Sequence, residues 1–474
     1  MRALRAFLLA ALTGAAAARA GAELVPTRYE LDLAVDFREE RVDGSARIAI
    51  ENAGAVPASE ASFLLYRLLA VSAVRDGAGE PLAFSQNVVA FEDDPKRQAN
   101  QVRVLLAPSL AAGEKRTLEI RYGGYLAGYV ETGALYIQDR VAEDFTILRE
   151  DADAYPTLRP PSHAKARAAP QASFDYVARV TVPASHVVAN GGRLVQRRVA
   201  GGRATYVYEN TLPAWRMDFA IARFETLERP GLRVYALPGD AAGAERVAGA
   251  AQAALALFTE WFGPVPNRPS YAVIEVPDGW GSQADVTSIL QSAAAFRDPG
   301  KLDEVYHEVS HLWNVAALDR PACRWEEGLA SFLGALLQER LDGGPPLDER
   351  AAKTLEKLRQ RLAEDPELRR VPMVDYGKAE MTNASYRTGL LLFYLLDRVA
   401  GPETFRAVLR EYHDAYAASG ATAADLARLF EKRAGPSVES VFRDWLFTTR
   451  WTGIADSGAS PAGIAARYRQ APAR

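Results

Sequence analysis

LDEVYHEVSHLWN, residues 302–314, places two histidines four positions apart in a helix predicted from Asp303 to Ala317. Residues four apart lie on one face of a helix with Cβ atoms about 5–6 Å apart, so the imidazoles of His307 and His311 can reach one small ion. Glu308 points about 100° round the helix from His307, where it can contact a water on that ion without being a ligand. This is the His-Glu-x-x-His pattern of zinc hydrolases.

The same residues also have a purely structural interpretation. The bare motif arises by chance in long chains, and two helical histidines often make only structural hydrogen bonds. Two observations favour a metal site: two of the five histidines of the chain lie here, and apolar residues flank them nearly all round the helix. A buried helix needs partners for its polar groups, and a cation would satisfy both histidines. The flanking residues are Leu302, Val305, Tyr306, Val309, Leu312 and Trp313.

The next predicted helix, Trp325 to Leu341, offers the third protein ligand that a catalytic zinc needs. The residues three, four and seven positions after Glu327 are all small, so that face can approach another helix closely. The corresponding face of Glu326 carries two leucines, which favours Glu327 as the ligand. Alternatively, both glutamates are solvated first-turn residues that the helix dipole favours.

The rest of the chain divides into two halves with different periodicity. From Tyr29 to about Phe224 apolar and polar residues alternate between turn signals, which predicts antiparallel sheets or a sandwich. From Ala241 onward helical patterns dominate. We therefore expect an α+β chain with a β domain over residues 21–230, a mostly helical domain over 231–456 and a loosely held tail over 457–474. The predicted linker is Glu228 to Leu232, with its Pro230-Gly231 breaker.

The N-terminus has the composition of a targeting segment. Arg2 and Arg5 precede a short apolar run, and Ala18-Arg19-Ala20 is a small-x-small cleavage signal, so residues 1–20 are predicted to be a secretory signal peptide. An uncleaved anchor is the alternative. Export to a periplasmic or secreted location is the corresponding expectation. No later stretch approaches the roughly 18–20 apolar residues of a membrane helix, so no stable membrane span is expected after cleavage.

Composition narrows the classes of function. The chain has 474 residues, of which 49% are hydrophobic and 24% charged, as in ordinary globular proteins. Its 56 Lys and Arg against 60 Asp and Glu give a formal charge of -4, without the basic excess of a nucleic-acid binder. Cys323 is the single cysteine, which excludes an intrachain disulfide and a cysteine-rich metal site.

The two predicted metal helices together resemble a known family. His307 to His311, followed by Glu-Gly-x-Ala-Ser-Phe at Glu327 to Phe332, is similar to the gluzincin zinc aminopeptidases, which include alanyl aminopeptidase and leukotriene hydrolase. The resemblance implies one zinc ion on His307, His311 and Glu327, with Glu308 as the proton carrier. It also implies a saddle-shaped β domain leading into a thermolysin-like domain, without the large C-terminal helical domain of the family. The stretch Leu312 to Glu326 is shorter than the family's spacer.

Tyr386 lies in a second matching segment. Ser385-Tyr386-Arg387-Thr388-Gly389 resembles the family's Tyr-x-Lys-Gly segment, whose tyrosine hydrogen-bonds the oxyanion, and Thr388 departs from the usual lysine. A phenol O–H aimed at developing charge suits transition-state stabilisation. A tyrosine that simply packs on the core is the alternative.

The third match concerns substrate binding. Gly281-Ser282-Gln283-Ala284-Asp285 aligns with the family's Gly-Ala-Met-Glu-Asn strand, which lines the substrate cleft, and Asp285 takes the place of the glutamate that grips the substrate amine. Gln283 lies in the same strand. Glu150, before Tyr155-Pro156, is a further candidate for an amine contact. Asp285 is equally well explained as a turn residue.

Three hypotheses of function result. The resemblance implies a zinc-dependent peptidase that removes N-terminal residues from peptides. A thermolysin-like endopeptidase or oligopeptidase is the second hypothesis, and a catalytically silent exported peptide-binding protein is the third. Asn314 and Glu304 are candidates for orienting the metal ligands. Nothing in the sequence indicates the oligomeric state.

Overall fold

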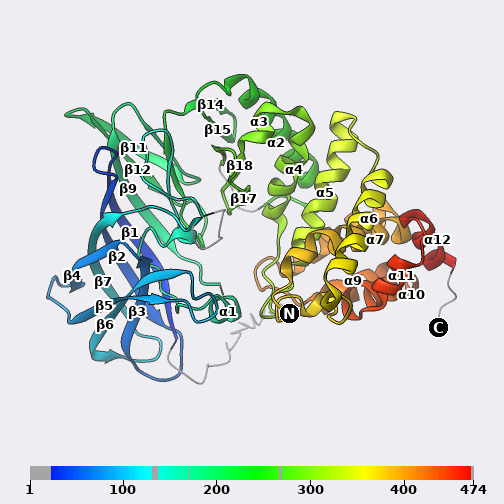
Figure 1. The fold of residues 1–474 in the computed structure, drawn as a ribbon, viewed down its shortest axis with the longest axis horizontal. Helices are drawn as coiled ribbons and strands as arrows, with labels where there is room; N and C mark the ends of the chain where they lie inside the picture. Colours follow the sequence, from blue (N-terminus) through cyan, green and yellow to red (C-terminus); the bar gives the residue numbers. More distant parts are fainter. Residues whose placement is uncertain (1–22, 131–136, 170, 266–269, 471–474) are drawn as a thin grey trace, which may run out of the picture.

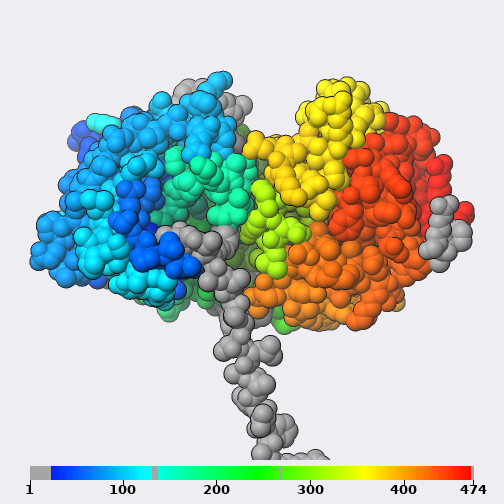
Figure 2. All heavy atoms as spheres, turned by 90° about the horizontal axis from the view of Figure 1, so that it is seen from below, coloured from blue at the N-terminus to red at the C-terminus, as the bar shows by residue number. Residues whose placement is uncertain are grey.

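The computed structural model describes residues 23–130, 137–169, 171–265 and 270–470, which form two lobes (Figure 1). The first lobe consists mainly of strands and the second mainly of helices, so the expected α+β fold is confirmed. Seen from below, the lobes stand side by side, and yellow-green residues of the second lobe reach the surface between them (Figure 2). The predicted signal segment lies outside the described residues. No helix among these residues is long and apolar enough to cross a membrane.

The first lobe is built on a seven-stranded sheet with the order β11-β12-β9-β1-β2-β7-β4, in which only β1 and β9 run parallel. Side chains alternate across it as the sequence predicts, because successive residues of a strand point to opposite faces. In β1 the buried residues are Tyr29, Leu31, Leu33 and Val35. The strands are β1 (Leu24–Asp36), β2 (Arg41–Asn52), β4 (Leu69–Asp76), β7 (Lys115–Tyr125), β9 (Asp175–Pro183), β11 (Arg193–Ala200) and β12 (Arg203–Glu209).

Two smaller three-stranded sheets complete the first lobe, with the orders β3-β6-β5 and β10-β13-β8. A short helix, α1 (His163–Ala168), and a 3-10 turn, η2 (Glu150–Ala152), lie on the connections. The strands are β3 (Ala58–Tyr66), β5 (Phe84–Ala90), β6 (Gln98–Leu110), β8 (Thr146–Leu148), β10 (Val187–Ala189) and β13 (Phe219–Ala222).

The second lobe begins with a five-stranded sheet of order β14-β15-β16-β18-β17. β14 pairs with β15 as a hairpin that turns at Pro230-Gly231, where Gly231 has a φ of 71°. This corrects the predicted linker over 228–232: the breaker is a hairpin turn, and the sheet of the second lobe starts at Glu225 rather than at 231. The strands are β14 (Glu225–Arg229), β15 (Leu232–Ala236), β16 (Tyr271–Val276), β17 (Gln283–Ala284) and β18 (Ser288–Ser292).

The central strand β16 is buried along its whole length because it is covered on both faces. Val273 packs in the core under the alanine-rich helix α2 (Ala241–Phe262), whereas Ile274 packs against Ile147 and Ala220 of the first lobe. One apolar cluster therefore contains residues of both lobes.

Helices form the remainder of the second lobe, and α5 lies between α4 and α7. The predicted helix over Asp303 to Ala317 is shorter than expected: α4 ends at Ser310, and a 3-10 turn, η4 (His311–Trp313), follows. The indole N–H of Trp313 donates to the Gly263 carbonyl at 2.8 Å, a tertiary contact that favours the tighter turn. The helices are α3 (Ala293–Arg297), α4 (Leu302–Ser310), α5 (Trp325–Asp342), α6 (Leu347–Glu364), α7 (Ser385–Ala400), α8 (Pro402–Tyr416), α9 (Ala423–Ala434), α10 (Pro436–Phe442), α11 (Arg450–Asp456) and α12 (Pro461–Gln470).

The expected loose tail over 457–474 is corrected for the residues that form α12. Ile464, Ala465 and Tyr468 of this helix are buried, and the Tyr468 hydroxyl donates to the Asp444 carboxylate at 3.1 Å. Pro461 stands at the first helical position, where a proline fits because its missing N–H would have no partner there. In the sequence alone, the same proline is typical of a helix breaker and favours an irregular tail.

Candidate active site

α4, η4 and α5 bring three predicted metal ligands to one point. The Nε2 atoms of His307 and His311 lie 3.3 Å apart, and they lie 3.3 Å and 3.5 Å from Oε2 of Glu327. The three residues form the one group of His, Cys, Asp or Glu side chains suited to hold a metal ion in the described part of the chain. Glu326 is not in this group, so the geometry favours Glu327 over Glu326 as the third ligand.

The separations of the three atoms fit a zinc ion. Zinc takes nitrogen and oxygen ligands at about 2.0–2.1 Å in tetrahedral geometry, which sets neighbouring ligand atoms about 3.3–3.4 Å apart. The observed distances of 3.3, 3.3 and 3.5 Å match this value. Three ligands of this kind hold one zinc ion and leave one position open for a water or a substrate.

Close packing of α4 against α5 produces this spacing. A Cβ atom on Gly334 of α5 would lie 2.7 Å from the carbonyl oxygen of Asp303 and 3.4 Å from Cβ of His307. No side chain larger than glycine fits there without a shift, as the small face after Glu327 predicts. Further contacts orient the rings: Nδ1 of His311 lies 2.8 Å from the Asn314 amide, and Nδ1 of His307 lies 3.5 Å from the Ser331 hydroxyl. Asn314 is thus confirmed as a neighbour of a ligand.

The environments of Glu308 and Glu327 move their pKa values in opposite directions. Glu308 is 7% exposed, and burial raises the pKa of its carboxyl. Burial also raises the pKa of Glu327, but hydrogen bonds to His307 and His311 and the charge of Arg324 outweigh it, and the net pKa lies well below the usual range. Glu327 is therefore ionised as a ligand must be, whereas Glu308 is suited to take up and release a proton.

Tyr386 lies at the same site, in the first turn of α7. Its ring stacks on the His307 ring with centroids 6.0 Å apart and an interplanar angle of 5°. Burial and the neighbouring Glu327 carboxylate raise the pKa of the phenol, so the hydroxyl keeps its proton and can donate a hydrogen bond. Thr388, where the family has a lysine, is fully buried and donates to the Ala384 carbonyl at 3.0 Å.

Arg324 is a site residue that the sequence analysis missed. It precedes α5 with a φ of 59° and a ψ of 40°, in the left-handed region, and its guanidinium forms an ion pair with Oε1 of Glu327. An arginine in this backbone conformation has no sequence signal, because glycine and asparagine are the residues usually found there.

The three candidates for substrate binding gather at the seam between the lobes and not in the metal cluster. β17, with Gln283, runs beside α4, and Oε1 of Gln283 accepts a hydrogen bond from Nη1 of Arg149 at 3.2 Å. Burial raises the pKa of Asp285 to about 7 and that of Glu150 to about 7, and both carboxyls interact with the charge of Arg216.

These residues belong to a buried polar network. Arg149 binds Asp139 through two hydrogen bonds of 2.8 and 3.0 Å, and Arg216 contacts both Asp151 and Asp218 at 2.7 Å. Buried ion pairs of this kind hold a rigid arrangement when every partner is satisfied. Oδ1 of Asp285, in contrast, is buried without a hydrogen-bond partner among the described residues.

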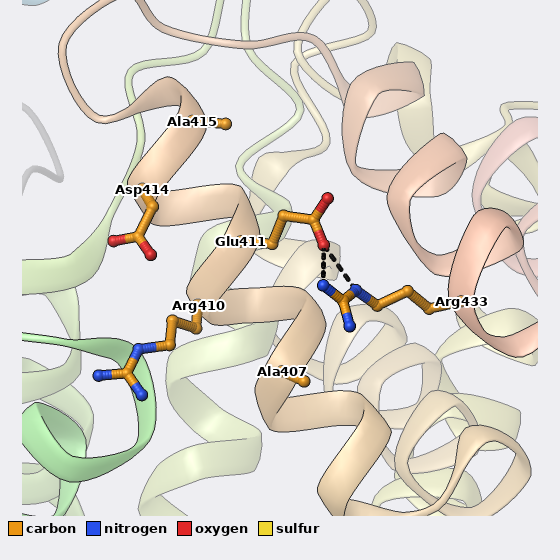
Figure 3. A pocket seen from close by; sticks show the side chains of 6 residues that line it. All are labelled: Ala407, Arg410, Glu411, Asp414, Ala415 and Arg433. Carbon is orange, nitrogen blue, oxygen red and sulfur yellow. Dashed lines mark hydrogen bonds and ion pairs between the residues drawn. The ribbon is translucent and has the colours of Figure 1, made fainter.

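A hollow elsewhere on the second lobe offers no comparable chemistry. It opens on α8, and its Glu411 carboxylate is paired with Arg433 (Figure 3). No residue of the metal cluster lies there. The lining residues are Ala407, Arg410, Glu411, Asp414, Ala415 and Arg433.

Comparison with known proteins agrees with this geometry. Residues 291–445 match the family described as peptidase family M1 domain. Aminopeptidase M1-A of Oryza sativa subsp. japonica is 24% identical over an alignment of 303 residues. The match covers 58% of this chain and 34% of that protein, so the chain spans about a third of the length of this curated relative.

Solved structures share the two-lobe fold. The M1 zinc metallopeptidase of Deinococcus radiodurans superposes with a TM-score of 0.68 at 21% identity, over 90% of this chain and 94% of that one. A mutant of that enzyme bound to a Tyr-Ser-Ala substrate gives the same values. Residues 291–445 are thus similar to a peptidase family M1 domain, and the two lobes share the fold of a solved M1 zinc metallopeptidase.

Proposed function

We propose that the protein is a zinc-dependent peptidase that removes residues from the N-terminus of peptides. The observation that carries the proposal is the triangle of ligand atoms on His307, His311 and Glu327, with edges of 3.3–3.5 Å. Glu308 and Tyr386, the two groups that hydrolysis needs beside such an ion, belong to the same site.

The chemistry divides among these residues. A zinc ion on the three ligands supplies Lewis acidity, which polarises a carbonyl and makes a water more acidic. Glu308 takes the proton of the attacking water and passes it to the leaving amine, and burial raises its pKa toward the range that suits both transfers. The Tyr386 hydroxyl donates a hydrogen bond to the carbonyl oxygen as negative charge develops on it.

The carboxyl groups at the seam support N-terminal specificity. Asp285 and Glu150 are half-buried and belong to a network that holds more acidic than basic groups. A substrate ammonium favours the charged form of both carboxyls and supplies the partner that Oδ1 of Asp285 lacks. The relative named aminopeptidase and the neighbour bound to a tripeptide are in keeping with such substrates.

Paired peptides test the proposal. The full chain with one equivalent of zinc is given a tripeptide and the same tripeptide with an acetylated amine, and Asp285→Asn is compared with the parent. We expect cleavage of the free peptide only, with KM raised more than kcat is lowered in the variant. Equal cleavage of both peptides would identify an endopeptidase instead.

Glu308→Gln is the control for the metal site itself. It keeps the shape of the side chain and removes its capacity to carry a proton. Zinc binding should persist while turnover falls by about 100- to 10,000-fold, the usual contribution of a general base. Turnover at the parent rate would exclude Glu308 from the mechanism, and zinc binding without turnover in the parent chain would favour a silent peptide-binding protein.

A further inference from the structure

Arg324 occupies a position that is unfavourable for an arginine on two counts. Its backbone is left-handed, with a φ of 59°, which brings Cβ too close to the following carbonyl. It is also the N-cap residue of α5 and makes no side-chain cap hydrogen bond, and a cation is disfavoured at the positive end of a helix dipole. A glycine would hold the same turn without either disadvantage. These disadvantages indicate that the Arg324 side chain makes an interaction that glycine could not.

The contacts of the side chain show what that interaction is. The guanidinium forms an ion pair with Oε1 of Glu327, whereas Oε2 of the same carboxylate lies 3.3 and 3.5 Å from the two histidines. The two oxygens thus face different partners. Glu327 is 8% exposed and Arg324 is 44% exposed, so a buried carboxylate is held from its solvent side.

We propose that Arg324 is a positioning residue for the metal site. By holding Oε1, it fixes the rotation of the Glu327 carboxylate so that Oε2 points to the place where the histidine nitrogens converge. Without this contact the carboxylate loses the one ion pair that holds Oε1 among the described residues, and its rotation about the last bond is less restrained. The proposal rests on the zinc site, and it does not depend on which peptides the protein cleaves.

Zinc affinity of the full chain is the direct test, measured by competition with a chromogenic chelator. Arg324→Gly relieves the backbone and removes the guanidinium. Loss of a residue that orients a metal ligand typically weakens metal binding by about 10- to 100-fold, and we expect that loss here. The metal-free variant should unfold at a temperature no lower than the parent. Arg324→Lys restores a positive charge and should recover part of the affinity.

Arg428→Ala is the matched control. Arg428 forms an ion pair with Asp425, three residues away at the start of α9, which repeats the chemistry of the Arg324 pair away from the metal ligands. Its loss should leave zinc affinity unchanged. Parent-like zinc affinity in a folded Arg324→Gly variant would overturn the proposal. A parent chain that binds zinc but cleaves no peptide would refute the proposed function alone, because the affinity comparison can still be made.

Discussion

Gly328 on α5 and Gly389 on α7 lie so close that neither helix can carry a side chain there. A Cβ atom on Gly328 would lie 2.3 Å from Cα of Gly389, 2.6 Å from its carbonyl carbon and 2.8 Å from the carbonyl oxygen of Ser385. All three are backbone atoms, which cannot rotate away. Since ordinary contacts begin at 3.4 Å, Gly328→Ala requires α5 and α7 to separate by about 1.1 Å, the difference between 3.4 and 2.3 Å.

Two opposing effects determine the stability of this variant. Alanine is favoured over glycine in a helix interior by about 1 kcal/mol. Overpacking costs about 1–3 kcal/mol, and the clash with rigid backbone belongs at the upper end of that range. We expect a net destabilisation of about 1–2 kcal/mol. The same shift moves Glu327 relative to Tyr386, and a displacement of about 1 Å in a catalytic arrangement can lower the rate about 100-fold.

Gly249→Ala on α2 is the matched control for the helix-propensity effect. Gly249 is exposed, and a Cβ atom there would meet nothing within 4 Å, so this variant should gain up to about 1 kcal/mol. Denaturant unfolding of both variants gives the difference in free energy, and peptide cleavage gives kcat/KM. A Gly328→Ala protein that matches Gly249→Ala in stability and the parent in kcat/KM would refute the reasoning.

Three further changes have expected outcomes. Tyr386→Phe should lower kcat about 100- to 1,000-fold, the usual effect of losing one oxyanion donor, and leave zinc affinity intact; steady-state kinetics and chelator competition separate the two. Glu275→Gln should flatten a pH dependence of stability. Burial raises the pKa of the fully buried Glu275 from 4.5 to about 8, so the free energy of unfolding of the parent falls as the pH rises through that interval. Denaturant titrations at both ends of the interval measure this fall. An equal fall in the variant would contradict the assignment to Glu275. Removing zinc with a chelator should lower the unfolding midpoint, because a ligand at a thousandfold excess over its Kd adds about 4 kcal/mol to the free energy of unfolding. A midpoint that does not depend on zinc would contradict the metal site.

The candidate metal ligands could be predicted from the sequence because their geometry is mostly local. Four residues of helix put His307 and His311 on one side, and the small residues after Glu327 select the face of α5 that approaches them. Tyr386 came from the family resemblance instead, since no spacing rule connects α7 to α4. The contact of Gln283 with Arg149 joins residues 134 positions apart, and only the docking of the two lobes creates it.

Other features are ambiguous in the sequence for physical reasons. Pro230-Gly231 favours a turn, but a turn serves a linker and a hairpin equally well, and the pairing of β14 with β15 decides between them. Pro461 ends a helix in one context and begins α12 in another. The left-handed backbone of Arg324 does not follow from its residue type, because glycine and asparagine usually adopt this conformation. Its proposed role becomes visible only when the partner of its guanidinium is known.

That partner also explains why Glu327 needs an arginine in addition to two histidines. Hydrogen bonds from His307 and His311 lower the pKa of Glu327, but they use the Nε2 atoms that a metal ion would occupy. An imidazole nitrogen that binds a metal through its lone pair carries no proton, so it cannot also donate a hydrogen bond to Glu327. The ion pair with Arg324 uses Oε1 and leaves Oε2 to the metal ion, so it can hold the carboxylate in the same orientation before and after an ion binds. A site organised in this way has its third ligand in place before the metal binds. The free energy needed to order that side chain therefore does not weaken metal binding.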